Sequence, residues 1–358
     1  MALGVLVVGD VINDILVETA APIVAGEDNP AGIRARAGGS AANQAAWLGW
    51  MGADVTFAGR VGAADVEFHR AELARFGVRA HLAADPVTST GSIVVLVGAD
   101  GERTFITDRG ANLRLAADDV PAALLDDVAL LHLTGHTLFE PGPREVVLGL
   151  IARARSRRIP FSVDPGSAAF LANLTPGEFL RWTDGAAICF PNRDEAAVLV
   201  GPTRMAQGEA APVPSADLAA TGQAAAGPEV TDPLAMAAFL TLHYGAVVLK
   251  LGADGALLAT ADREPQRFPA RQMTVRDTTG AGDAFCAGFL AAWLAREALA
   301  EAMGAGGRAA ATAVSTLGGR PEPRAERRHS PLRLICPDSA CWSRCWWLIR
   351  LARRRGGG

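Results

Sequence analysis

The stretch Asp277-Thr278-Thr279-Gly280-Ala281-Gly282-Asp283 places small residues between aspartates, directly before an apolar run of helical length. Glycine lets a backbone approach a ligand closely. If a helix begins here, the N–H groups of Gly280, Ala281 and Gly282 lie at its positive end, which favours an anion such as a phosphate. Asp283 would repel that anion as a ligand, but its carboxylate can take a proton from an attacking hydroxyl. We therefore predict an anion-binding turn (Gly280–Gly282) with a catalytic base, against the plainer alternative of a capped helix.

A second glycine-rich segment lies far upstream, at Gly38-Gly39-Ser40-Ala41-Ala42-Asn43. Its small residues would bring the backbone close to a ligand, and the Asn43 amide offers both a donor and an acceptor. Taken alone, the segment is equally typical of a tightly packed helix start.

The elements that must position these residues follow an alternating pattern of apolar strands and helices. This alternation predicts an α/β fold with a mostly parallel sheet covered by helices on both faces. The expected strands are Leu3–Val8, Val55–Ala58, Ala129–Thr134, Phe161–Asp164, Ala186–Phe190 and Ala246–Leu251, and the expected helices are Ala41–Met51, Ala64–Phe76, Arg144–Arg157 and Asp283–Arg296.

Three regions depart from this alternation. Residues of about 15–37 and 88–112 contain short alternating segments and an Asp-Gly hairpin signal, which predict a small β-sheet lid over a cleft. Residues of about 201–231 are rich in Ala, Pro and Gly, which indicates a long mobile loop. We expect one domain over residues 1–320, followed by an atypical basic tail at 321–358 with Cys and Trp residues that lies outside the fold.

Composition excludes several classes of protein. The 358 residues carry a formal net charge of −4, which gives no general attraction to nucleic acid or an anionic membrane. The N-terminus has the pattern of a buried strand rather than a signal peptide, and no long uninterrupted apolar run predicts a membrane span. The five cysteines do not form a disulfide framework. We expect a cytoplasmic protein that binds neither nucleic acid nor membrane.

Together, the two glycine segments resemble the signature of the PfkB, or ribokinase-like, carbohydrate kinase family. The N-terminal pattern of that family is filled by Gly38, Gly39, Asn43, Gly52 and Gly62, and the C-terminal pattern is matched from Asp277 to Leu290. Three lesser features occur in the family's order: Gly9-Asp10 with Asp14, the segment Pro191–Ala196, and the segment Lys250–Gly255. The resemblance covers about residues 3–319.

The resemblance implies a ribokinase-like fold with a β-sheet lid and a role for each matching residue. Asp14, Gly39, Asn43 and Asn112 match residues that contact the sugar. In the C-terminal motif, Gly280, Ala281 and Gly282 match the anion hole and Asp283 the catalytic base.

The nucleotide side is implied in the same way. Asn192 and Glu195 match a pair that organises Mg²⁺ and the phosphates of ATP, whereas Lys250, Gly252 and Gly255 fall where the family contacts the nucleotide. Asp277 and Thr279 resemble ligands of the K⁺ ion that several members use. The family also implies a homodimer formed through the lid.

The chain departs from the family at a few positions. Ser40 stands where the ribokinase subgroup has a lysine, and Gly307 stands where an asparagine is expected near the adenine. His136 follows a predicted strand, where it either serves the substrate or is an ordinary packed side chain.

The resulting hypothesis is an ATP-dependent kinase that phosphorylates a hydroxyl, in particular a hydroxymethyl group, of a small sugar or sugar acid. A nucleoside kinase of the same fold is the nearest alternative. A degenerate member that binds ligand without turnover is the alternative from another class.

Overall fold

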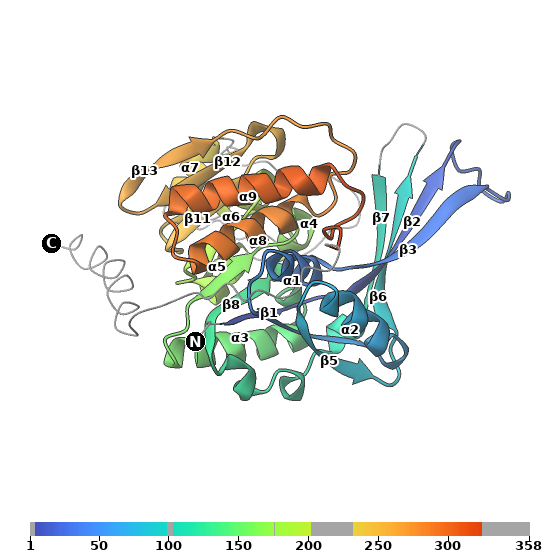
Figure 1. The fold of residues 1–358 in the computed structure, drawn as a ribbon, viewed down its shortest axis with the longest axis horizontal. Helices are drawn as coiled ribbons and strands as arrows, with labels where there is room; N and C mark the ends of the chain where they lie inside the picture. The colour runs from blue at the N-terminus through green and yellow to red at the C-terminus, as the bar shows by residue number, and fades with distance from the viewer. Residues whose placement is uncertain (1–3, 99–102, 175, 202–231, 324–358) are drawn as a thin grey trace, which may run out of the picture.

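The computed structural model describes residues 4–98, 103–174, 176–201 and 232–323. These residues form a large sheet, in the strand order β13-β12-β11-β10-β9-β8-β1-β4-β5, and a small sheet, in the order β3-β2-β6-β7. Figure 1 shows the small sheet projecting from one side of the main body. The strands of the large sheet are β1 (Gly4–Val8), β4 (Val55–Gly62), β5 (Arg79–Asp85), β8 (Val128–Thr134), β9 (Phe161–Asp164), β10 (Ile188–Cys189), β11 (Ala246–Lys250), β12 (Ala256–Thr260) and β13 (Arg263–Phe268).

The large sheet is parallel from β5 to β11, and β12 and β13 continue it as antiparallel strands. Every residue of β1 is buried, as expected for a strand with helices on both sides. Side chains alternate along this strand, so Val5 and Val7 join one apolar cluster whereas Leu6 and Val8 join the other. The core is therefore split into two layers by the sheet.

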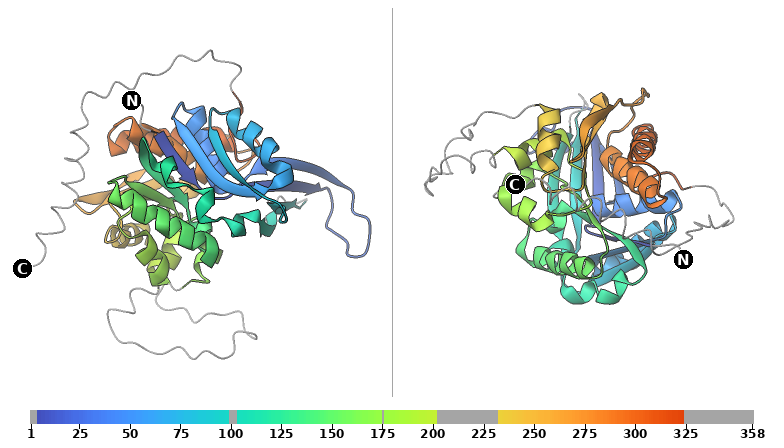
Figure 2. Two further views of the ribbon diagram at one scale, coloured as in Figure 1. Left: turned by 90° about the horizontal axis from the view of Figure 1, so that it is seen from below. Right: turned by 90° about the vertical axis from the view of Figure 1, so that its left-hand side faces the viewer.

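Helices cover both faces of the large sheet, as Figure 2 shows in its right-hand view. One face packs against α1 (Ser40–Trp50), α2 (Val66–Ala74), α8 (Ala281–Leu294) and α9 (Leu299–Val314). The other face packs against α3 (Pro141–Ser156), α4 (Ala168–Leu171), α5 (Pro176–Thr183), α6 (Arg193–Val200) and α7 (Pro233–Leu240). The predicted α/β architecture is confirmed.

The strand order reverses its direction of growth at β1, which pairs with β4 on one side and β8 on the other. Loops that leave neighbouring strands at such a point diverge to opposite faces, and ligands of parallel α/β sheets bind in the crevice beyond the carboxyl ends. Asp10, Thr134 and Asp164 all lie at or just beyond carboxyl ends of strands in this region.

The small sheet consists of β2 (Ile12–Thr19), β3 (Ala31–Gly38), β6 (Thr90–Val97) and β7 (Arg103–Gly110). Its strands lie within or beside the two stretches that the alternating pattern assigned to a small sheet, so that prediction is confirmed. β6 and β7 are antiparallel, as the hairpin signal required, although the Asp-Gly turn itself lies outside the described residues.

Some boundaries differ from expectation. β10 is only two residues long, and the antiparallel pair β12–β13 was not predicted. β4 continues past Ala58 to Gly62, because Gly59 and Gly62 keep pairing with β5 although glycines weaken a strand pattern. Residues 202–231 of the predicted loop and residues 324–358 of the tail lie outside the described residues.

Within the part of the chain that the structure describes, no helix has the length and apolar character needed to cross a membrane.

Candidate active site

Helix α8 starts at the predicted anion-binding turn. Gly280 precedes the helix with φ of +72°, a left-handed conformation that favours glycine, and its carbonyl accepts the first helical hydrogen bond from Ala284 N at 2.8 Å. A side chain on Gly280 would also collide with the backbone, since an added Cβ would lie 2.5 Å from Cα of Gly319. The Ala281 N–H group donates to the Thr278 carbonyl at 3.3 Å, just outside the helix. The other first-turn N–H groups have no acceptor inside the helix, which suits the turn to an anion.

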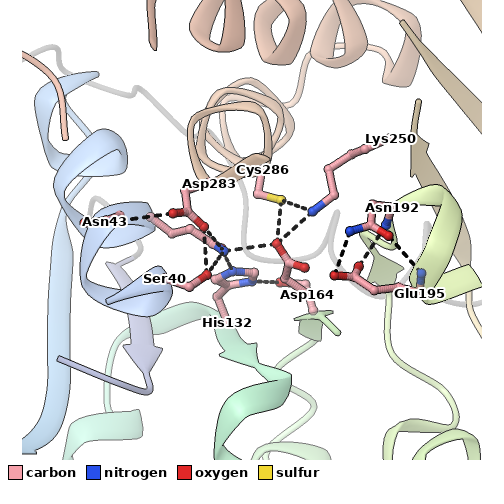
Figure 3. A network of polar contacts seen from close by, with 11 residues as sticks. Ser40, Asn43, His132, Asp164, Asn192, Glu195, Lys250, Asp283 and Cys286 are labelled. Atoms are coloured by element: carbon pink, nitrogen blue, oxygen red, sulfur yellow. Dashed lines mark hydrogen bonds and ion pairs between the residues drawn. The ribbon is translucent and has the colours of Figure 1, made fainter. Parts of the chain in front are cut away.

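The carboxylate of Asp283 faces α1, across the gap between the two helices (Figure 3). Its Oδ1 accepts hydrogen bonds from Ser40 Oγ at 2.7 Å and Gln44 Nε2 at 3.1 Å, and its Oδ2 accepts one from Asn43 Nδ2 at 3.2 Å. Burial raises the pKa of Asp283 to about 7, and the nearby Asp164 adds to the rise while the three donors oppose it. This is a suitable pKa for a base that works near neutral pH.

Asp10 fixes the start of α1. Its carboxylate accepts from the backbone N–H groups of Ser40 at 3.2 Å and Ala41 at 3.3 Å, and from Thr134 Oγ1 at 3.3 Å. Gly39 has φ of +95°, and an added Cβ would lie 2.6 Å from the Asp10 carbonyl oxygen. The glycine pair is therefore needed for close packing at the helix start, besides any ligand contact.

Asp14 and Asn112 lie where the small sheet joins the main body. Asp14 packs over Gly38, and an added Cβ on that glycine would lie 2.0 Å from Oδ2 of Asp14. Burial raises the pKa of Asp14 to about 6, opposed by Arg320 and increased by Asp10.

The side chain of Asn112 is bonded to backbone at both ends. It accepts from Val11 N at 2.9 Å and donates to Val11 O at 2.8 Å and Arg109 O at 2.9 Å. These bonds hold the base of the small sheet, so the substrate contact expected of Asn112 stays a prediction.

His136 lies just beyond the end of β8, beside Arg109. Its ring contacts Phe139 and Phe170 edge-on, and its carbonyl accepts from Arg109 Nη2 at 3.1 Å. Burial lowers the pKa of His136. The surroundings are those of a packed aromatic side chain, while Nδ1 has no hydrogen-bond partner among the described residues.

Asn192 and Glu195 form a reciprocal cap at the start of α6. Asn192 Oδ1 accepts from Glu195 N at 2.8 Å, and Glu195 Oε2 accepts from Asn192 N at 2.8 Å. Burial raises the pKa of Glu195 to about 7, an effect that Lys250 opposes and Asp164 increases. The predicted pair is thus brought together by local helix capping.

Lys250 points beneath the anion-binding turn. Its ammonium lies 2.9 Å from Oδ2 of Asp164, and both side chains are largely buried, with 14% and 4% of their surfaces exposed. An added Cβ on Gly282 would lie 3.5 Å from Nζ, so the positive charge sits directly behind the turn. The pKa of Lys250 is raised, because the attraction of Asp164 and other negative groups outweighs the effect of burial.

The other predicted nucleotide contacts lie in the turn after β11. Gly252 and Gly255 have φ of +60° and +89°. An added Cβ on Gly255 would lie 2.0 Å from the Phe268 carbonyl oxygen, whereas Gly252 faces open space. The turn after Lys250 is therefore packed against the backbone at Gly255 and open to a ligand at Gly252.

Asp277 ties the anion-binding turn to the segment after α9. Its carboxylate accepts from Thr279 N at 2.9 Å and Gly318 N at 2.8 Å. The role of Asp277 and Thr279 as cation ligands stays a prediction. Among the described residues, no three His, Cys, Asp or Glu side chains are grouped closely enough to hold a metal ion alone.

A cavity of about 690 Å³ connects the turn with the Asn192–Glu195 pair. Mg²⁺ in kinases is held by one or two protein oxygens together with the phosphates, so the Asp194 and Glu195 carboxylates fit this cation. Phe105 of β7 reaches the same cavity from the small sheet. The cavity is lined by Phe105, Gly166, Ser167, Ala168, Asn192, Asp194, Glu195, Thr278, Thr279 and Gly280.

The structure also places residues in the site that the sequence reasoning did not assign. Asp10, Gln44, His132, Asp164 and Cys286 all belong to the polar cluster around Asp283. Asp10 and Asp164 carried a usable signal, because each follows or ends a buried strand expected in a parallel sheet.

Comparison with known proteins gives three findings. Residues 3–325 match the family described as pfkB family carbohydrate kinase. A 1-phosphofructokinase of Haloferax volcanii is 33% identical over 262 residues, which is 72% of this chain and 72% of that protein. An aminoimidazole riboside kinase of Salmonella typhimurium is 28% identical over 260 residues, 71% of this chain and 72% of that protein.

The fold is also shared with solved structures. The crystal structure of a probable sugar kinase from Rhizobium etli superimposes with a TM-score of 0.72 at 23% identity, covering 90% of this chain and 96% of the other. The experimental structure thus has the same fold as this chain, in agreement with the predicted ribokinase-like fold.

Proposed function

This chain belongs to the pfkB family of carbohydrate kinases, and we propose that it moves the γ-phosphate of ATP to a hydroxyl, in particular a hydroxymethyl group, of a small sugar or sugar acid. The observation that carries the proposal is the meeting of Asp283 with the upstream glycine segment. Its carboxylate accepts hydrogen bonds from Ser40, Asn43 and Gln44 of α1. The start of α8, which carries both Asp283 and the anion-binding turn, therefore lies against the start of α1.

The reaction assigns each part a step. The acceptor O–H gives its proton to Asp283 as its oxygen forms a bond to the γ-phosphorus, and the bond from that phosphorus to the bridging oxygen breaks to release ADP. The Gly280–Gly282 amides, with the Lys250 charge behind them, stabilise the charge on the transferred group. Mg²⁺, when bound by the phosphates and the Asn192–Glu195 region, supplies further charge neutralisation.

Binding roles follow from the same geometry. Asp14, Gly39 and Asn43 would contact the acceptor, with Asn112 holding the backbone beside it. The open side of the turn at Gly252 would meet the nucleotide. Asp277 and Thr279 would take a K⁺ ion, which would order the turn without joining the chemistry.

The small sheet would act as a lid over the acceptor. Phe105 of that sheet lines the cavity next to the anion-binding turn, which supports closure from this side. Ile33 and Ile106 lie on the opposite face of this sheet from Phe105, because neighbouring strand residues point to opposite sides. They are 68% and 57% exposed, and such apolar surface supports a homodimer formed through the two lids. The proposed kinase domain runs to about residue 320, with the tail outside it.

The acceptor is tested by a substrate panel. We expect ADP release that depends on one of ribose, fructose, a fructose phosphate or 2-keto-3-deoxygluconate. Ser40 replaces the lysine of the ribokinase subgroup, and this makes ribose the least expected of the four. No turnover with any of them in a folded preparation would count against the proposal.

A nucleoside acceptor is the second candidate. The 28% identity to an aminoimidazole riboside kinase favours it, because that relative's name states a riboside substrate. Adenosine and pseudouridine in the same panel separate the two candidates.

A binding-only protein is the remaining alternative, and Gly307 on α9 is the feature that favours it. Thermal stabilisation by ATP and sugar without any ADP release would support this alternative.

A further inference from the structure

Gln44 is a fully buried amide between two carboxylates. Its Nε2 lies 3.1 Å from Asp283 Oδ1, 3.1 Å from Asp164 Oδ2 and 3.2 Å from Ser40 Oγ. Its Oε1 meets Nε2 of His132, a buried residue of β8. In Figure 3 the cluster runs from Asn43 through Asp283 and Asp164 to Lys250.

The two carboxylates dictate the orientation of this amide. The opposite orientation would place the Gln44 oxygen against two anionic acceptors and its NH₂ group against the His132 ring. In the favoured orientation the Gln44 NH₂ group points towards Asp164 and Asp283, and the Gln44 Oε1 atom needs a hydrogen-bond donor. Among the described residues, the atom that contacts Oε1 is Nε2 of His132. His132 must therefore carry its proton on Nε2.

The other ring nitrogen of His132 completes the chain. Nδ1 lies 2.7 Å from Ser162 Oγ and, in this tautomer, accepts the Ser162 proton. Burial lowers the pKa of His132 to about 4, with Asp164 opposing the shift and Lys250 adding to it, so the ring is neutral near pH 7. Hydrogen bonds thus point in one direction, from Ser162 through His132 and Gln44 to Asp283.

This chain makes the two oxygens of Asp283 unequal. Oδ1 accepts from both Ser40 and Gln44, whereas Oδ2 accepts from Asn43 alone. Asn43 is itself held by Arg320 of the segment after α9, whose Nε donates to the Asn43 oxygen at 3.2 Å. An oxygen that already accepts two hydrogen bonds has little capacity left for a third donor.

We propose that Gln44, oriented by His132, is a positioning residue for phosphoryl transfer that holds Oδ1 of Asp283 and leaves Oδ2 as the oxygen that takes the acceptor's proton. The inference rests on the proposed kinase function. Asp283 Oδ2 accepts the hydroxyl proton, and that proton leaves to solvent after the phosphorylated product and ADP depart.

The charged groups around Asp283 explain why the link matters. Asp164 of β9 is the nearby negative group, and it is paired with Lys250 of β11 and accepts from the Cys286 thiol of α8 at 3.2 Å. The Gln44 N–H groups lie between Asp164 and Asp283. Without these donors the two carboxylates would face each other, and Asp283 would hold its proton more tightly.

The first experiment replaces the donor by an acceptor of the same shape. In Gln44→Glu, His132 can still donate to one oxygen, but Asp283 loses a donor and gains a neighbouring acid. We expect kcat to fall at least tenfold, KM for MgATP to change less than threefold, and the acid limb of the kcat profile to move to higher pH.

Tyr244→Phe is the matched control. It removes another buried hydrogen bond, the 2.8 Å contact with Thr183, which involves no residue of the Gln44 cluster. We expect it to lower Tm without moving the pH profile. A Gln44→Glu enzyme with the parent kcat and pH profile, alongside an inactive Asp283→Asn, would overturn the inference and leave the kinase function standing. An Asp283→Asn enzyme as active as the parent would overturn both.

The second experiment needs no activity and no folded variant of Gln44. Nitrogen NMR of the histidine-labelled parent distinguishes the neutral tautomers of the six histidines, and a His132→Gln sample assigns the signal. A neutral ring protonated on Nε2 between about pH 6 and about pH 8 is the expected result. A proton on Nδ1, or a charged ring in this range, would overturn the orientation of Gln44 and the inference with it.

Discussion

Ser40 Oγ lies 2.7 Å from Oδ1 of Asp283, although 243 positions separate the two residues in the sequence. The contact joins the start of α1 to the start of α8, so the two glycine segments form one site. Each helix start is held separately, α1 by the Asp10 carboxylate and α8 by the left-handed Gly280. The position of Asp283 relative to Ser40 is therefore set by how both helices begin.

Activity should depend on pH through Asp283. A general base acts as the carboxylate, and burial raises the pKa of this group to about 7, so kcat/KM should rise as pH increases through about 7 and level off above it. The measurement is kcat/KM at saturating MgATP from about pH 5.5 to about pH 9. A profile that is flat across this range would contradict the assignment.

Gly280→Ala should impair both folding and catalysis. An alanine at φ of +72° costs about 1–2 kcal/mol in backbone strain, and its Cβ would meet Gly319 at 2.5 Å. We expect lower stability in denaturant unfolding and a lower kcat, because the turn must shift.

Gly149→Ala serves as the control for that substitution. Gly149 lies inside α3, where an added Cβ meets nothing within 4 Å. Alanine there should stabilise the protein by roughly 0.5–1 kcal/mol and leave kcat unchanged. Equal effects of the two substitutions would show that the Gly280 turn is not special.

Breaking the buried ion pair should be costly. Lys250→Met leaves the Asp164 carboxylate buried without its cation, which is expected to lower the free energy of unfolding by about 3–5 kcal/mol. The double variant Lys250→Met/Asp164→Asn removes the uncompensated charge and should recover much of the loss. Additive losses in denaturant unfolding would contradict coupling between the two side chains.

The segment after α9 should be needed up to Pro323. The Gly319 carbonyl accepts from Trp47 Nε1 at 2.9 Å, the Arg320 guanidinium donates to Asn43 and to the Gly38 carbonyl, and the Glu322 carbonyl accepts from Trp50 Nε1 at 3.0 Å. A chain that ends at Pro323 should keep the parent's Tm and kcat, whereas one that ends at Gly319 should lose several degrees of Tm and part of its activity. Equal behaviour of the two truncations would show that these contacts are dispensable.

Much of the fold could be predicted because its strands and helices carry strong local patterns. Strand β1 is apolar at every position, and α8 follows a glycine turn with a long apolar run. The short β10 could not be predicted, because a strand of two residues shows no periodicity. The pair β12–β13 was missed because β13 is an exposed edge strand that is polar at nearly every position, without an apolar pattern.

The site was predictable only in part, because its motif residues were recognisable and their partners were not. Lys250 resembled a nucleotide contact, but its ion pair with Asp164 depends on β9 and β11 flanking β10. Strands that are separated by one other strand lie about 10 Å apart, which a lysine side chain can bridge. The sequence does not show which strands are separated in this way, so the pair could not be predicted. The contacts of Gln44 and His132 likewise depend on how α1 sits on β8.

The substitution Asp283→Asn decides whether Asp283 is the base of the proposed phosphoryl transfer. Acceptor-dependent ADP release is measured for parent and variant on the best substrate of the panel, with ligand binding followed by calorimetry. We expect that binding persists while kcat falls by about 10²-fold or more. Equal kcat values in variant and parent would contradict it.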